Sequence, residues 1–186
     1  NFKNTDFIND INTASKIFDE QLGYNPPFFS YPFGEYSSLI KKYISNNFKF
    51  SFGQHSGIID LNKDPYELPR FPINEKYGDL KRFEFLINLY PLQYKNLFPE
   101  EKYLINFNNP PKFSVEFFLE QKNINNINCF SNEGDKWEKS NISFNKNILH
   151  LTFREKFNFR RGRINCSLND NGIWRWFGVQ FSVKQD

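Results

Sequence analysis

The spacing of hydrophobic and polar residues changes once along this chain of 186 residues. In the first half, apolar residues recur at helical spacing in some segments and form short uninterrupted runs in others. These patterns predict helices over 5–23 and 36–46 and after Asp79, and strands over 28–32, 48–52 and 68–73. Strands that alternate with helices are typical of parallel α/β units. We therefore expect an α/β fold in residues 1–95.

From Lys112 onward the hydrophobic pattern takes a period of two. Short apolar runs recur about every ten residues, separated by turns rich in Asn, Gly and Asp, and this predicts a small antiparallel β-sandwich. Prolines 91, 99, 110 and 111 lie between the two patterns and indicate a domain boundary, so the sandwich is expected over 105–186. The predicted fold class is therefore α/β plus all-β.

The composition narrows the range of functions. Aromatic residues make up 19% of the chain, and we expect most of these rings in the core and a minority in sugar-binding surfaces. A net charge of +3 argues against a dedicated nucleic-acid-binding protein. No apolar run approaches the roughly 20 residues that cross a bilayer, so no transmembrane segment is expected. Because the chain starts at Asn, it is expected to be a processed product or a fragment.

Three motifs occur in order in the first half: SYPFGEYS at 30–37, FGQHSG at 52–57 and LPRFPINEKYGDLKRF at 68–83. Together they resemble the second half of polysaccharide deacetylases of carbohydrate esterase family 4, in the bacterial branch that carries a β-rich tail. The resemblance covers most of the chain. It implies that residues 1–95 are the C-terminal part of a distorted (β/α) barrel. The implied function is that of the C-terminal portion of a metal-dependent deacetylase acting on a surface or exported polysaccharide.

The metal-binding half of the family's site is absent from these residues. The resembling enzymes carry a Thr-Phe-Asp-Asp strand end and a histidine motif upstream, and this chain has only His55 and His150. A divalent metal, zinc in the first instance, is therefore expected in the full-length enzyme, with ligands from a missing N-terminal half as partner. The chain alone is expected to be inactive. The alternative is a non-catalytic carbohydrate-binding or interaction module.

The resemblance assigns catalytic roles to residues at the predicted strand ends. The backbone N–H of Phe33 is expected to donate to the oxyanion that forms on the acetyl group. His55 is expected to protonate the leaving amine, or else simply to line the groove. Arg70 is expected to hold a catalytic carboxylate ionised, because this chain has Ser30 where many family members have an arginine. The alternative for Arg70 is a salt bridge at the rim of the barrel.

A second set of residues is expected to contact the sugar. They lie at predicted strand ends or on one face of the last strand, and they are Tyr31, Pro32, Gln54, Ser56, Asn74, Trp174 and Trp176. For the two tryptophans core packing is the first interpretation, and contact with carbohydrate is the second.

Two further features lie in the second half. Cys129 and Cys166 fall in separate predicted strands and belong to no CxxC motif, so they are expected to form a disulfide or to be two buried free thiols. A disulfide would favour a periplasmic, extracellular or cell-envelope location. The basic cluster from Arg160 to Arg163 is compatible with nucleic-acid binding, but a solvated hairpin is the preferred interpretation.

Overall fold

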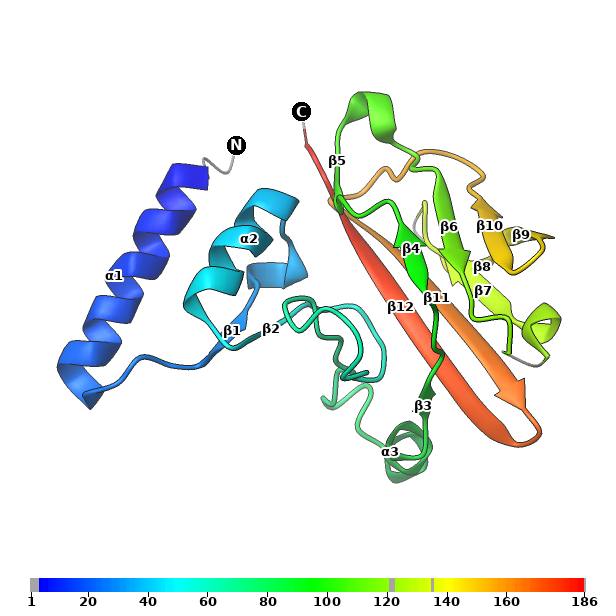
Figure 1. Ribbon diagram of the computed structural model, residues 1–186, viewed down its shortest axis with the longest axis horizontal. Helices are drawn as coiled ribbons and strands as arrows, with labels where there is room; N and C mark the ends of the chain where they lie inside the picture. Colours follow the sequence, from blue (N-terminus) through cyan, green and yellow to red (C-terminus); the bar gives the residue numbers. More distant parts are fainter. Residues whose placement is uncertain (1–3, 121–122, 135, 186) are drawn as a thin grey trace.

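The computed structural model describes residues 4–120, 123–134 and 136–185. It is a mixed α/β structure in which strands predominate and helices are few. In Figure 1 the first two helices lie on one side and the sheets of the second half on the other. The long strand β12 (Ile173–Val183) runs along the side of the sheets that faces the helices.

The described residues form three α-helices, which lie close to the predicted positions: α1 (Asn4–Leu22), α2 (Ser38–Asn47) and α3 (Leu80–Ile87). Side chains cap two of them, which satisfies amide groups that a first helical turn leaves without partners. Ser37 accepts from the N–H of Ile40 at 3.3 Å, and Asp79 accepts from the N–H of Arg82 at 3.0 Å. The predicted cap at Asp79 is thus confirmed.

A small parallel sheet carries the first two motifs. It pairs β1 (Phe28–Ser30) with β2 (Phe50–Phe52). One face packs on α1 and α2 through a buried cluster whose apolar members are Phe7, Ile11, Tyr31, Tyr36, Ile40 and Ile44. Two parallel strands and two helices in this order are what the pattern of the first half predicts.

The predicted third strand at 68–73 is wrong in extent. Only Leu68 pairs with the parallel sheet, through a single bridge to Phe52. Pro69 and Pro72 carry no N–H and therefore cannot continue a ladder. The described residues form no closed barrel, and the distorted (β/α) barrel remains a prediction.

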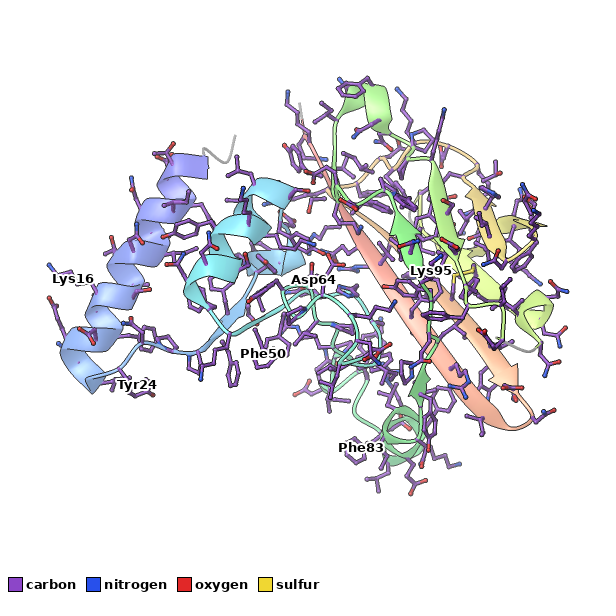
Figure 2. The ribbon with its side chains drawn as sticks, viewed as in Figure 1. Lys16, Tyr24, Phe50, Asp64, Phe83 and Lys95 are labelled. Carbon is purple, nitrogen blue, oxygen red and sulfur yellow. A yellow bond between two sulfur atoms is a disulfide. The ribbon has the colours of Figure 1, made fainter. Side chains whose placement is uncertain are left out.

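The parallel sheet has an unpaired edge at β1 and exposed aromatic side chains. Within the described residues no strand other than β2 pairs with β1. Phe28 and Phe50 are exposed and their ring centroids lie 5.8 Å apart. Figure 2 labels Phe50 beside the small sheet and Tyr24 on the segment that follows α1. An edge of this kind is open to further strands.

Two sheets form a sandwich-like arrangement in the second half. The four-stranded sheet has the order β4 (Asn96–Phe98), β6 (Phe113–Glu116), β10 (Ile148–Thr152) and β9 (Asn141–Asn145). The six-stranded sheet has the order β3 (Tyr90–Pro91), β12, β11 (Arg161–Asp170), β7 (Asn128–Ser131) and β8 (Glu138–Lys139), with β5 (Tyr103–Leu104) also paired to β12. The 3-10 turns η2 (Asn106–Asn108) and η3 (Ile124–Asn126) connect strands.

The main hydrophobic core is built from residues of both large sheets. Alternate residues of β11 are buried, as the period of two predicts. Val115, Leu149, Ile164 and Phe181 are fully buried in this core. The described residues after Lys112 contain no α-helix, in agreement with the predicted change of period.

The proline-rich stretch differs from the expected boundary. Residues 91–111 contribute β4 to one large sheet and β5 to the other. Leu92 and Leu104 are buried in the main core. The stretch is therefore part of the sandwich. None of the described helices combines the length and the apolarity that crossing a bilayer requires.

Cys129 and Cys166 form a disulfide between the neighbouring strands β7 and β11. The two residues face each other directly in the antiparallel ladder, with Cα atoms 4.1 Å apart. This is shorter than the commonest spacing of about 5.5 Å, because paired strands already hold the two backbones close together. The bond is compatible with an oxidising compartment.

We predict that this disulfide stabilises the fold by roughly 3–4 kcal/mol, since it closes a loop with a sequence separation of 37. Denaturant unfolding of oxidised and reduced protein measures the difference. The double variant Cys129→Ser/Cys166→Ser is the control, and it should match reduced wild type under both conditions. Two free thiols in the unfolded, unreduced protein would contradict the bond.

Candidate functional site

The three sequence motifs meet one another and the strand β12. A Cβ atom on Gly34 would lie 2.5 Å from the backbone nitrogen of Gln54, so the first and second motifs touch through their backbones. A Cβ atom on Gly178 of β12 would overlap the carbonyl oxygen of Ser56. Glycine at these two places lets the segments approach closely. Segments far apart in sequence thus form one site.

The short turn η1 (Pro32–Gly34) has an unusual backbone. Phe33 adopts φ 57° and ψ 9°, in the left-handed region, and Gly34 follows with φ 71°. For a residue with a Cβ atom this conformation costs about 1–2 kcal/mol. Such conformations persist where the surrounding structure imposes them, and they cluster at functional sites.

A buried glutamine imposes the conformation of this turn. The side chain of Gln180 on β12 is 3% exposed, and its Nε2 donates to the carbonyl oxygens of Phe33 and Gly34, both at 3.0 Å. Its Oε1 accepts from Nε of Arg163 on the neighbouring strand at 2.9 Å. Both the nitrogen and the oxygen of the Gln180 amide are therefore hydrogen-bonded, and they connect the first motif to the six-stranded sheet.

Sequence reasoning missed Gln180, although β12 carries a signal for it. One face of this strand, which includes Phe177, Val179 and Phe181, enters the main core. The other face carries Gln180 and Ser182, which are also buried. A polar pair in the middle of a long apolar strand indicates a second layer that covers it, and here that layer holds the predicted site.

The Phe33 amide itself meets the requirement for a free donor. Among the described residues, no acceptor for its N–H is found, whereas the amides of Gly34 and Glu35 donate to the carbonyls of Tyr31 and Pro32 at 2.8 and 3.1 Å. The Phe33 ring is 53% exposed, so this residue is accessible from solvent. A free, rigidly held backbone N–H can stabilise a developing oxyanion.

A groove of about 440 Å³ adjoins this turn. The turn and α2 form one wall, the last residues of β12 form the other, and the polar and aromatic lining includes Tyr36, Tyr103, Arg160 and Lys184. Its size falls within the usual range for ligand-binding clefts. Pro32 and Phe33, which are predicted site residues, both line it.

Tyr31 has a structural position. Its side chain is 1% exposed, and its hydroxyl donates to the carbonyl of Tyr66 and accepts from Ser51, both at 3.0 Å. Burial raises the pKa of Tyr31 to about 12. Its ring stacks on Tyr36 with centroids 4.5 Å apart. The side chain therefore offers no free surface to a sugar and instead supports the turn that follows it.

His55 lines a small cavity of about 60 Å³ together with Glu67, Lys102 and Gln180. Burial lowers the pKa of His55 to about 4, and it outweighs the opposing effect of the Glu67 carboxylate. The imidazole is therefore neutral at pH 7. A general acid must carry its proton before the reaction, so this environment favours the groove-lining role over proton donation.

A network of charges holds the loop between β2 and Leu68 against α2. Lys41 donates to Asp64 at 2.6 Å and to Glu67 at 3.0 Å, and Tyr36 donates to Glu67 at 2.9 Å. Figure 2 places Asp64 between the helices and β12. Burial alone would raise the pKa of Glu67, but the ammonium groups of Lys102 and Lys41 bring it below the usual value. The loop is thus fixed by ionised side chains.

The residues of this site do not fit the family's metal. Among the described residues, no group of three or more His, Cys, Asp or Glu side chains is placed so that it could hold an ion. The carboxylates of Asp64 and Glu67 are engaged by Lys41. A metal of the family's kind would therefore need ligands from outside the described residues.

Arg70 and Asn74 lie at the surface. The Arg70 side chain is exposed and has no ion pair within the described residues, although its backbone N–H donates to the carbonyl of His55 at 3.0 Å. The Asn74 side chain accepts from the amides of Lys76 and Tyr77, both at 3.1 Å. Asn74 thus stabilises its own turn, and Arg70 joins the second and third motifs through the backbone.

Of the remaining residues predicted to contact sugar, two lie at the site and two pack on rings from the third motif and α3. Gln54 and Ser56 are half-buried beside Gly34 and Gly178. Trp174 and Trp176 lie on one face of β12, as predicted. Their rings pack edge to face on Phe85 and Phe71, each at 6.0 Å. These contacts serve packing, and the structure does not bring the tryptophans to the Phe33 groove.

Comparison of the chain with protein-family models, curated protein sequences and solved structures gave no match. The resemblance to the deacetylases therefore remains an expectation from the three sequence motifs.

We predict that Gln180→Leu lowers the free energy of unfolding by about 1–3 kcal/mol, because it leaves two carbonyls and the Arg163 guanidinium without a partner. Chemical denaturation measures this. Gln185→Leu is the matched control on the exposed end of the same segment, and it should change stability by less than about 0.5 kcal/mol. Equal losses in the two variants would contradict the role of Gln180.

A second prediction concerns pH. His55 has a pKa of about 4 in the folded chain, against about 6.5 when unfolded. Between these values the unfolded chain binds a proton that the folded chain does not. The free energy of unfolding therefore falls on acidification, by up to about 1.4 kcal/mol per pH unit.

His55→Gln should flatten this dependence, as followed by denaturant unfolding at several pH values from 7 to 4. His150→Gln is the control, because His150 is exposed. The contribution of Glu67, whose pKa is lowered, is lost only at more acidic pH. If both variants retained the wild-type slope, the lowered pKa of His55 would be disproved.

Proposed function

We propose that this chain is the C-terminal portion of a metal-dependent polysaccharide deacetylase, and that residues 1–95 belong to a distorted (β/α) barrel completed by further strands. The observation that carries this proposal is the left-handed Phe33, whose turn Gln180 fixes while its N–H remains free among the described residues. The resemblance places an oxyanion-binding amide at this residue. The open edge of β1 supports a larger sheet.

In this proposal the chain holds the acetylated sugar and stabilises the oxyanion. The sugar would lie in the groove beside Phe33, and the amide N–H would donate to the acetyl oxygen as negative charge develops there. A divalent metal would supply an activated water when bound, on ligands outside this chain. An exported substrate agrees with the disulfide, which favours a periplasmic, extracellular or cell-envelope location.

A second candidate is a non-catalytic carbohydrate-binding module. It is supported by the groove, whose lining combines the rings of Phe33, Tyr36 and Tyr103 with polar groups. Aromatic faces suit the apolar faces of sugars, and such a surface binds without a metal. The two candidates differ in whether acetate is released.

We predict that residues 1–186 alone release no acetate from N-acetylated chitooligosaccharides, with or without added zinc. One oxyanion donor contributes only about 10²–10³-fold, which is far below what amide hydrolysis requires. Joined to a segment that carries the metal and base motifs, the chain should release acetate. Acetate is measured enzymatically over time.

In that active protein, Gln180→Leu should lower kcat by up to about 10²–10³-fold, because the Phe33 amide loses its fixed position. Gln93→Leu, at an exposed glutamine that does not line the groove, should leave kcat unchanged. Metal-dependent acetate release by the 186 residues alone would contradict the proposal that the metal ligands lie outside this chain. Sugar binding without release, even in the longer protein, would favour the binding module.

A further inference from the structure

The basic cluster that begins at Arg160 lies beside the Phe33 turn rather than in a solvated hairpin. Nη2 of Arg160 lies 2.8 Å from Oε2 of Glu35, and Nε of Arg161 lies 3.1 Å from Oε1 of the same carboxylate. Both guanidinium groups also flank the Phe33 ring, with Cζ atoms 5.4 and 5.2 Å from its centroid. Chain segments far apart in sequence thus place Arg160 in the lining of the groove and Arg161 beside it, against the Phe33 ring.

These cations are not neutralised. Two guanidinium groups share the single carboxylate of Glu35. Each guanidinium has five N–H donors, and in the described part of the chain Arg161 has no acceptor other than Glu35. Lys184 lines the same groove. Burial, followed by the positive charge of Arg161, lowers the pKa of nearby Arg163, which agrees with excess positive charge at this place.

We propose that the groove binds a polysaccharide that carries carboxylate groups, with a uronate sugar on Arg160 and Arg161 next to the sugar at Phe33. Planar guanidinium groups suit carboxylates because they can donate two parallel hydrogen bonds. The inference rests on the proposed function, since it names the substrate class of the same groove. In this inference the two arginines determine whether the groove prefers acidic or neutral polysaccharides.

A glycan fits this groove better than a nucleic acid does. Nucleic-acid sites follow a long phosphate backbone with a broad basic surface, and this chain has a net charge of only +3. The positive groups here are few and lie within one groove with aromatic and apolar walls. Single-stranded DNA therefore serves as a competing probe in the test.

The test measures the affinity of the full chain by calorimetry for an oligogalacturonate, for chitopentaose and for a single-stranded DNA oligonucleotide. We expect the uronate oligomer to bind at least about tenfold more tightly than chitopentaose, because one charge-assisted hydrogen bond is enough to give a difference of this size. Arg160→Gln/Arg161→Gln should remove this advantage. Lys16→Gln/Lys95→Gln removes the same charge from α1 and from a residue beside β4 (Figure 2), and it should leave the affinity unchanged.

Glu35→Gln guards against a variant that merely misfolds, because it frees the arginines and should tighten uronate binding. Equal affinity for acidic and neutral oligomers, equal losses in the arginine and lysine variants, weaker binding by a folded Glu35→Gln protein, or tighter binding of DNA would each overturn the inference. Uronate binding that depends on the arginines would stand even if the longer protein released no acetate, and that result would refute the proposed function alone.

Discussion

Burial of the C-terminal half of β12 on both of its faces is the constraint on which the rest of the structure depends. One face of this strand completes the core between the two large sheets, through Phe177 and Phe181. The other face receives the loops of the first half at Gly178 and Gln180. Polar groups that a strand buries in this way are usually hydrogen-bonded. Gln180 forms such bonds by donating to the Phe33 turn, and the strained backbone of that turn follows from them.

The same constraint links the electrostatics of the two halves. Arg163 donates to the side-chain oxygen of Gln180. Arg160 and Arg161, which precede Arg163 in sequence, form ion pairs with Glu35 beside the turn. This basic segment therefore has two roles: Arg163 bonds the buried Gln180, and Arg160 lines the groove. A disulfide farther along β11 fixes the neighbouring strand β7. The sheet that presents these groups is thus rigid on the side away from the site.

Local patterns were enough to predict most of the elements. The periods of the hydrophobic residues, the cap at Asp79 and the turn signals depend on neighbours in sequence, so α1, α2, α3 and the long strands lie near their expected places. The strand at 68–73 was overestimated, because its prolines outweigh its apolar character. The proline-rich stretch was interpreted as a domain boundary because its short strands have no period of their own and are ordered only by the sheets that they join.

The candidate site was less predictable, for a physical reason. The motifs point to Phe33, but its left-handed backbone and the half-buried position of His55 depend on contacts with β12 that no local pattern contains. Tyr31 shows the same limit. Its motif suggested a sugar contact, whereas the packing of α2 and the loop around Tyr66 covers it. Burial is a property of the assembled layers, and it decided which polar side chains remained available.

The hydrogen bonds from Gln180 to Phe33 and Gly34 span 147 and 146 positions of the chain. During synthesis on the ribosome, the first motif therefore emerges long before the residue that shapes it. Until β12 has been translated and has entered its sheet, nothing compensates for the cost of the left-handed Phe33, and the turn remains relaxed. A nascent chain of this protein thus carries the complete motif without the left-handed turn, which forms only after β12 has joined its sheet.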